Sequence, residues 1–399
     1  MLDLIRTTAA RPDVKALLDA WPRLSQAVVD EALAIQAIPA PTFGEAARAA
    51  HVEHRLASLG LQDVHQDTLH NVYARLPGTR PELPAVLVGA HLDTVFPAST
   101  PLQTRHTGRQ GRIYGPGLGD NSVGVAAMLA LASMLKQRGP RLPADIWWVA
   151  TVGEEGLGNL KGMREVQRRL GAQLGVAIIL EGIGIGRIYS AGLGVRRLGI
   201  TVRGPGGHSW LHADRPSAIH EIVRIGAALV DGIPLPEDPR TTLNIGLIEG
   251  GRSINTRAPQ ASMAIDLRSS DVKTLTRLEQ QVRAIAAQHA HPPDLTVQVD
   301  LIGERPCAAL SDEHPLVQAA LATLRYLGFE THPPESGSTD ANVLLAAHLP
   351  AVCVGITSGG NAHTLEEYIE PGMLPLGMAQ ITLLTITAAE HSAEWGRWF

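Results

Sequence analysis

Histidine and acidic side chains follow several apolar segments of this chain, each at the point where the segment ends. Glu154 and Glu155 stand side by side after the apolar run 146–152, and Glu181 follows the run 176–180. Burying such groups is costly unless they are paired or bind a metal. The full set is His91, Asp93, Asp120, Glu154, Glu155, Glu181 and His363. Repetition of this pattern is the strongest functional signal in the sequence.

These residue types suit hydrolysis assisted by divalent cations. Four or more carboxylates in one crevice repel one another and raise each other's pKa unless a cation neutralises them. Mixed histidine and carboxylate ligation suits zinc, with manganese or cobalt as close competitors. A centre with two ions about 3.5–4 Å apart needs one bridging carboxylate and two further ligands for each ion. Five ligands meet that need, and a sixth carboxylate remains to move protons.

Taken one at a time, these residues have ordinary structural interpretations. His91 could be a packed or surface histidine, Asp93 a turn residue, and Asp120 the N-cap of a helix over 122–137. The glutamates could be solvated loop acids. Unrelated residues would not recur at the corresponding end of each element, however, so the joint pattern favours a metal site.

Other chemistries are poorly supported. The glycine-rich segments GPGLGDNSVG and GIGIG lack the Lys-Ser/Thr pair of a P-loop and the spaced glycines of a dinucleotide-binding turn. The sequence contains no G-x-S-x-G elbow, which argues against a serine hydrolase.

The candidate ligands need elements that bring distant segments together. Apolar runs predict strands at 71–76, 85–92, 145–152, 176–182 and 350–356. Helical patterns alternate with them at 25–38, 44–60, 122–139, 160–170, 314–329 and 374–392. Apolar strands that alternate with helices indicate an α/β layer with a largely parallel sheet. Ligands bind beyond the carboxyl ends of such strands, which is where the candidate residues lie.

A second pattern interrupts this layer. Strands at 195–204, 241–251, 261–269 and 295–303, with helices at 217–233 and 272–290, follow the order βαββαβ. We therefore expect a catalytic domain formed by residues 1–193 and 306–399, with residues 194–305 inserted as a smaller domain.

Bulk properties narrow the class of protein. At 399 residues the chain exceeds what one hydrophobic core usually supports, so two domains are expected. The net charge of −5 argues against nucleic acid or an anionic membrane as the main partner. The N-terminus does not read as a signal peptide, and no run approaches the length that crosses a bilayer. We expect a cytoplasmic protein whose Cys307 and Cys353 stay reduced.

Six motifs occur in order: HLDTV, GLGDN, GEEG, LEG, GGHSW and GGNAHTLEE. Together they resemble the M20 family of metallopeptidases and deacylases, which includes carboxypeptidase G2, aminoacylase and peptidase T. The likeness runs from about residue 25 to residue 399, and six motifs in order are highly specific. The resemblance implies that the insert is a lid or dimerisation domain, through which a homodimer can form.

The resemblance also implies a set of metal ligands. His91 and Glu181 would bind one divalent ion, Glu155 and His363 the other, and Asp120 both. Zinc is the expected metal, with cobalt or manganese possible.

Further roles around the metals follow from the same resemblance. Asp93 would hydrogen-bond His91 and fix its tautomer. Glu154 would be the general base that takes a proton from the attacking water. The peptide bond between Asp120 and Asn121 is commonly cis in this family.

Residues of the insert would contact the substrate. By resemblance, His208 polarises the scissile carbonyl. Asn244, Asn255 and Arg268 occupy positions where similar proteins hold the substrate's carbonyl or carboxylate. As an alternative, Arg268 forms a salt bridge to Asp266.

The loop 336–342 resembles the one that precedes a helix at the border of the same pocket. Its Asp340 could equally be a plain charge at the start of that helix. The segments GSTDAN and GGNAHTLEEYIE most resemble the peptidase T branch, which favours an exopeptidase that removes the N-terminal residue of short peptides. An N-acyl-amino-acid deacylase or a carboxypeptidase is the alternative, and a metal-dependent binding protein without turnover is a remote one.

Overall fold

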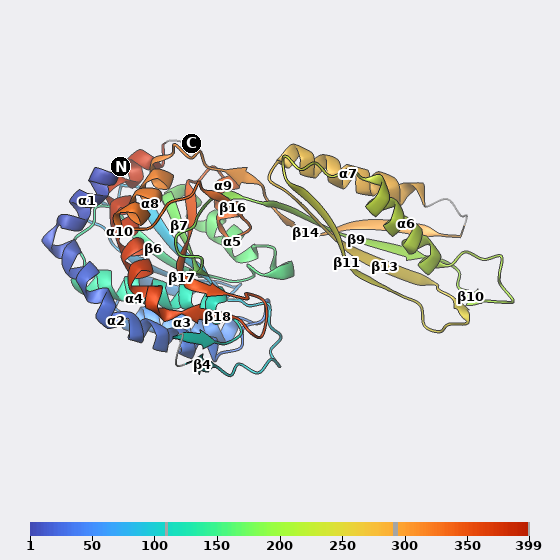
Figure 1. Cartoon of the computed structure of the whole chain (residues 1–399), viewed down its shortest axis with the longest axis horizontal. Helices are drawn as coiled ribbons and strands as arrows, with labels where there is room; N and C mark the ends of the chain where they lie inside the picture. Colours follow the sequence, from blue (N-terminus) through green and yellow to red (C-terminus); the bar gives the residue numbers. More distant parts are fainter. Residues whose placement is uncertain (108–110, 290–293, 398–399) are drawn as a thin grey trace. The chain divides into compact units, whose positions relative to one another are not determined.

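The structure is a computed structural model of the chain, and it describes residues 1–107, 111–289 and 294–397. The chain divides into two compact units (Figure 1). The first contains Met1–Gly192 and Ala309–Phe399, and the second contains Leu193–Ala308. The first unit is discontinuous in sequence and carries all five residues expected to bind metal.

A mixed sheet of 12 strands is the framework of the first unit. At its centre β3 (Ala85–His91) lies parallel between β6 (Ile146–Thr151) and β7 (Leu174–Ile183), and β7 also pairs in parallel with β17 (Ala351–Gly360). The other strands are β1 (Gln62–Gln66), β2 (Val72–Leu76), β4 (Arg105–Thr107), β5 (Arg112–Tyr114), β8 (Ile188–Gly192), β15 (Ala308–Ala309), β16 (Glu335–Gly337) and β18 (Tyr368–Glu370). The predicted largely parallel sheet is confirmed.

The central strands are buried because they are apolar on both faces. Every residue of β3 and β6 is buried. Such sequences fit strands that helices cover on both sides, and Figure 1 shows helices on both sides of the sheet. Two of them, α4 (Val123–Arg138) and α10 (Leu374–Trp395), pack against β3, β7 and β17. The others are α1 (Leu2–Ala10), α2 (Pro12–Gln36), α3 (Ala46–Ser58), α5 (Lys161–Leu170), α8 (Pro315–Tyr326) and α9 (Ala341–Ala346).

The N-terminal helical region starts earlier than the sequence predicted. Periodicity indicated a helix from residue 25, but α2 begins at Pro12 and runs through Pro22. Proline removes a backbone donor from a helix interior, so it usually indicates a break. Here Trp21 is buried before Pro22 and Val28 is buried after it, and the packing of both parts holds the helix together.

The expectation that no apolar run is long enough to cross a bilayer is wrong for two helical segments. By length and composition alone, Leu118–Arg138 and Pro371–Trp395 are long and apolar enough among the described residues. In the structure 83% and 78% of their most apolar windows are buried inside the protein. Their hydrophobicity is that of core helices, which must be apolar all round when they pack on a central sheet.

The second unit is a four-stranded antiparallel sheet with two helices. The sheet has the order β11 (Thr241–Gly250), β13 (Gln260–Ser269), β9 (Gly194–Arg203) and β14 (Thr296–Arg305). Helices α6 (Ala218–Gly232) and α7 (Val272–Gln288) cover one face and share a core with β9 and β13. A separate two-stranded antiparallel sheet pairs β10 (Gly207–His208) with β12 (Thr256–Arg257), which lie far apart in the sequence. The predicted βαββαβ order is confirmed; residue 290, the last of the expected second helix, lies outside the described residues.

Candidate metal centre

Strand ends in the first unit place the candidate ligands. His91 is the last residue of β3, Glu155 follows β6, and Glu181 lies near the end of β7. Asp120 belongs to the turn Leu118–Ser122 that leads into α4, and His363 follows β17. Because β3, β6, β7 and β17 are parallel neighbours, their carboxyl ends meet at one edge of the sheet.

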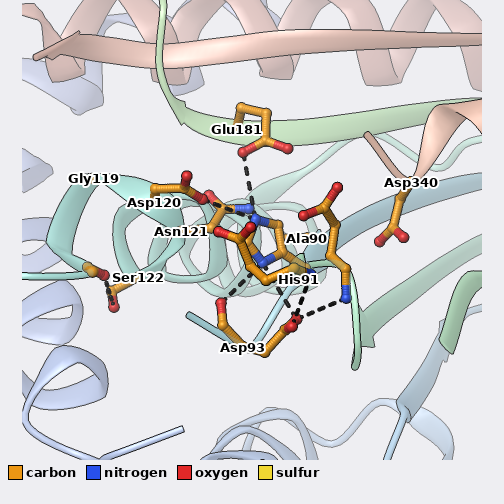
Figure 2. A network of polar contacts seen from close by, with 12 residues as sticks. Ala90, His91, Asp93, Gly119, Asp120, Asn121, Ser122, Glu181 and Asp340 are labelled. Atoms are coloured by element: carbon orange, nitrogen blue, oxygen red, sulfur yellow. Dashed lines mark hydrogen bonds and ion pairs between the residues drawn. The ribbon is translucent and has the colours of Figure 1, made fainter. Parts of the chain in front are cut away.

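Asp120 lies between the two histidines. Its Oδ1 is 3.0 Å from His91 Nε2, and its Oδ2 is 3.1 Å from His363 Nε2. His91 Nε2 is also 3.6 Å from a Glu181 oxygen, and His363 Nε2 is 3.1 Å from Glu155 Oε1. Figure 2 shows His91 between Asp120, Glu181 and Asp93. Two triads of possible metal ligands therefore share Asp120.

The donor set fits two divalent cations. His91 Nδ1 lies 3.1 Å from the backbone carbonyl of Asp93. If Nδ1 carries the proton and donates there, Nε2 presents a lone pair to the carboxylates of Asp120 and Glu181. Lone pairs that face one another repel unless a cation lies between them, and imidazole with carboxylate is a zinc-type ligand set. The second triad, with His363 Nε2 between two carboxylates, has the same character.

The pKa values in this cluster reflect its excess of negative charge. Burial raises the pKa of Glu181 to about 6. Hydrogen bonds to Asp120 and Glu155 raise the pKa of His363 to about 10. Burial opposes charge on His91, but Glu181, Asp120 and Asp93 raise its pKa well above the ordinary value. The raised pKa values show that the cluster favours bound positive charge, and a metal cation would supply such charge.

Asp93 acts mainly on the backbone of the glutamate pair. Its Oδ1 and Oδ2 accept the N–H groups of Glu154 and Glu155, both at 2.9 Å. The carboxylate is 3.6 Å from His91 Nδ1, farther than the carbonyl of the same residue. In the predicted hydrogen bond between the two residues, the His91 ring therefore donates to the backbone oxygen of Asp93, because the Asp93 carboxylate is occupied by the turn after β6.

Three residues that sequence reasoning missed support the same turns. Thr42 Oγ1 donates to Asp93 Oδ2 at 2.9 Å. Glu45 Oε1 accepts the N–H of Gly153 at 3.0 Å, directly before the glutamate pair. Arg48 is almost fully buried and donates to the carbonyl of Leu92 at 2.7 Å. Only Arg48 carried a sequence signal, as a charged residue on the face of α3 that is otherwise apolar.

The comparisons with known proteins decide the family. Residues 87–385, most of the chain, match the peptidase family M20/M25/M40. The chain belongs to this family. The resemblance that the six motifs predicted is confirmed, and the protein is a hydrolase of the peptidase or amidohydrolase type.

Solved M20 structures share its fold. A tripeptidase from Staphylococcus aureus subsp. aureus Mu50 is 23% identical, with a TM-score of 0.77 over 92% of this chain and 99% of that one. A dinuclear metal-binding M20 peptidase from Bacillus subtilis is 17% identical, with a TM-score of 0.68 over 92% and 99%. A succinyl-diaminopimelate desuccinylase from Delftia acidovorans is 25% identical over 75% of this chain and 81% of its own length.

The residues of this M20 chain that were expected to contact the substrate, His208, Asn244, Asn255 and Arg268, lie in its second unit. His208 is exposed, and its Nδ1 accepts the backbone N–H groups of Trp210 and Leu211 at 3.2 and 3.4 Å. The turn of His208 contacts that of Asn255, whose carbonyl accepts the Ser209 N–H at 2.9 Å. These two turns, distant in sequence, are therefore neighbours.

Asn244 and Arg268 lie on neighbouring strands of the same unit. Asn244 is exposed on β11, directly opposite Asp266 on β13. Arg268 Nε donates to Asp266 Oδ1 at 2.7 Å, so the guanidinium forms the salt bridge that was the alternative interpretation. To bind the substrate, Arg268 would have to release Asp266 and pair with the substrate instead.

Asp340 lies at the start of α9, as expected, in the N-cap position. It precedes α9 but makes no capping hydrogen bond with its side chain, which is buried and instead accepts the hydroxyl of Thr151. Asp340 thus links α9 to the end of β6. The expected cis peptide bond between Asp120 and Asn121 is present.

Replacing Arg48 by methionine is expected to lower the free energy of unfolding by about 3 kcal/mol, because the buried carbonyl of Leu92 and the partly buried carbonyl of Ile38 lose their donor. Urea unfolding followed by circular dichroism measures the change. Arg55→Met on the same helix is the control, since its partly exposed pair with Glu31 is worth at most about 1 kcal/mol. Equal losses in both variants would contradict the assignment.

Proposed function

We propose that the protein is a two-metal exopeptidase that removes the N-terminal residue of short peptides. The observation that supports hydrolysis best is the pair of ligand triads that share Asp120, with Glu154 beside them. The similar tripeptidase from Staphylococcus aureus supports the choice of a short peptide as substrate.

The five ligands divide between two ions in this proposal. His91 and Glu181 would hold one and Glu155 and His363 the other, while Asp120 would bind both through the two oxygens that face the histidines. Zinc suits this donor set best, with cobalt and manganese as alternatives. Such ions polarise the amide carbonyl and neutralise the charge that develops on it.

Glu154 is the proposed general base. Its side chain is buried and groups with His91 and Glu155, with one ligand atom from each within 4.8 Å of the others. The hydrogen bond from its backbone N–H to Asp93 fixes its position on the turn. Glu154 accepts a proton from the attacking water and passes it to the leaving amine. One side chain therefore acts first as the base and then as the acid.

His208 is proposed to donate a hydrogen bond to the scissile carbonyl. Because its Nδ1 accepts two backbone N–H groups, the neutral ring carries its proton on Nε2. A neutral imidazole held this way presents one N–H donor, which suits stabilisation of an oxyanion. Asn244 and Asn255 are proposed to bind polar groups of the substrate.

A substrate panel tests the proposal. Dipeptides, tripeptides, tripeptides blocked at the N-terminus, and N-acetyl or N-succinyl amino acids are incubated with the metal-loaded protein, and products are identified by mass spectrometry. We expect release of the first residue from free tripeptides and little cleavage of blocked ones. Turnover of acyl amino acids alone would favour a deacylase, and release of the last residue a carboxypeptidase.

A deacylase is the second candidate because of one specific relative. The desuccinylase from Delftia acidovorans aligns over three quarters of this chain. A binding protein without turnover is not favoured, since the expected base Glu154 is present beside the ligands.

We also propose that two copies associate through the second unit. Leu247 and Ile248 are exposed on β11, an edge strand whose outer side is open for pairing in the sheet of this unit. Light scattering at working concentration should give the mass of a dimer, and a monomer would contradict the proposal.

A further inference from the structure

A buried carboxylate lies behind the Asp120 turn. The Glu367 side chain is fully buried, and its Oε1 accepts the N–H groups of Gly119 at 2.7 Å and of Asp120 at 2.8 Å. Its Oε2 accepts the N–H of Gly117 at 3.2 Å. Three backbone donors thus converge on the two oxygens of one side chain.

The turn is shaped to admit this carboxylate. Gly117 has φ of 70°, a conformation that favours glycine. A Cβ atom added to Gly119 would lie 2.4 Å from Ile183 Cδ1 and 3.2 Å from Glu367 Oε1. These N–H groups lie just before α4, and N–H groups at the start of a helix have no carbonyl partner within the helix. Glu367 supplies the acceptor that this segment lacks.

The same residue belongs to the segment that carries His363. The Glu367 N–H donates to the carbonyl of Thr364 at 3.1 Å, and its own carbonyl accepts the Gly115 N–H at 2.9 Å. Backbone and side chain of Glu367 therefore both bind the segment 115–120. Glu367 thus joins the turn of His363 to the turn of Asp120. The side chains of these two residues are also in contact, with His363 Nε2 3.1 Å from Asp120 Oδ2.

We propose that Glu367 is a positioning residue that sets Asp120 between the two metal sites and couples it to His363. This inference rests on the proposed two-metal function, because it concerns the geometry of that site. The Glu367 carboxylate binds backbone N–H groups of the turn, so in this proposal it acts through Asp120 and is not a catalytic residue.

The variant Glu367→Gln separates this role from simple packing. Glutamine has nearly the same shape, but its NH₂ group cannot accept the hydrogen bond that one carboxylate oxygen accepts. In one of the three contacts the glutamine NH₂ group would face a backbone N–H, so two donors would repel each other and the turn would have to shift. We expect metal affinity to fall about 10- to 100-fold, the usual effect of losing a residue that orients a ligand. We expect kcat to fall with it while KM for a tripeptide changes little.

The experiment uses the full chain, stripped of metal and titrated with Co²⁺. Calorimetry gives the affinity, and visible absorption reports the geometry around the bound ion. Glu366→Gln is the matched control, because Glu366 is the adjacent residue in sequence but its side chain is 67% exposed and pairs with Arg105. The control should match the wild type in affinity, spectrum and turnover, and circular dichroism verifies that each variant is folded.

The outcomes separate this inference from the function it rests on. A folded Glu367→Gln protein with unchanged Co²⁺ affinity and spectrum would overturn the positioning role, even if its melting temperature fell. Wild-type protein that neither binds Co²⁺ nor cleaves peptides would instead overturn the proposed function. If the glutamine variant does not fold, Glu367→Asp replaces it, since the shorter carboxylate cannot reach all three donors. If neither folds, amide hydrogen exchange of wild-type Gly117 and Gly119 decides: slower exchange on metal loading supports the role, and unchanged exchange overturns it.

Discussion

Glu154→Gln is expected to lower kcat about 10²- to 10⁴-fold while the protein keeps both metal ions. The amide cannot accept a proton from water, but the five expected ligands are untouched. The hydrogen bond from the backbone N–H of residue 154 to Asp93 also remains, so the turn should hold its shape. Steady-state kinetics on a tripeptide and elemental analysis of bound metal measure the two quantities together.

The neighbouring glutamate provides the contrast. Glu155→Gln should lose metal as well as activity, because Glu155 Oε1 faces His363 Nε2 at 3.1 Å in the second triad. The two variants remove the same charge at adjacent, equally buried positions. If Glu154→Gln turned over peptide at the wild-type rate, another residue would have to be the base.

Removing metal with a chelator is expected to reduce hydrolysis to the uncatalysed rate. Adding zinc, cobalt or manganese should restore it, because the cluster has carboxylates and imidazoles but no other group that polarises an amide carbonyl within the two triads. Metal should also stabilise the fold: at free metal 100 times Kd, the free energy of unfolding rises by about 2.7 kcal/mol.

Thermal unfolding with and without metal gives a readout independent of activity. A magnesium-loaded sample is the control, since magnesium prefers oxygen ligands and should restore little. Hydrolysis that persists in protein shown by elemental analysis to be free of metal would contradict a metal-dependent mechanism.

The candidate ligands could be predicted from sequence because of where they lie. Each of His91, Glu155 and Glu181 stands at the end of an apolar strand, where an unpaired charge is costly, so its presence needs a reason. Parallel pairing then brings these strand ends to one edge, and the structure gathers them with Asp120 and His363. The motif order added roles that strand patterns alone do not give.

The residues that hold the ligands in place were harder to predict. Glu367 stands beside the exposed Glu366, and nothing in the sequence separates a carboxylate that binds backbone from one in solvent. Asp93 was expected to orient His91 with its carboxylate, but whether a side chain or a carbonyl meets an imidazole depends on the path of the turn. Short strands such as β4 and β5 were missed as well, since three residues carry no periodicity.

The late position of β17 in the chain affects how the protein is made. β7 is complete at Ile183, but its partner β17 starts only at Ala351, after the whole inserted unit has been translated. At ribosomal rates these roughly 170 residues take about 10 to 35 s. Throughout that time the nascent chain carries an apolar strand with an open hydrogen-bonding edge, which is a template for aggregation. Yield on overexpression should therefore depend on chaperones that shield β7 until translation is finished.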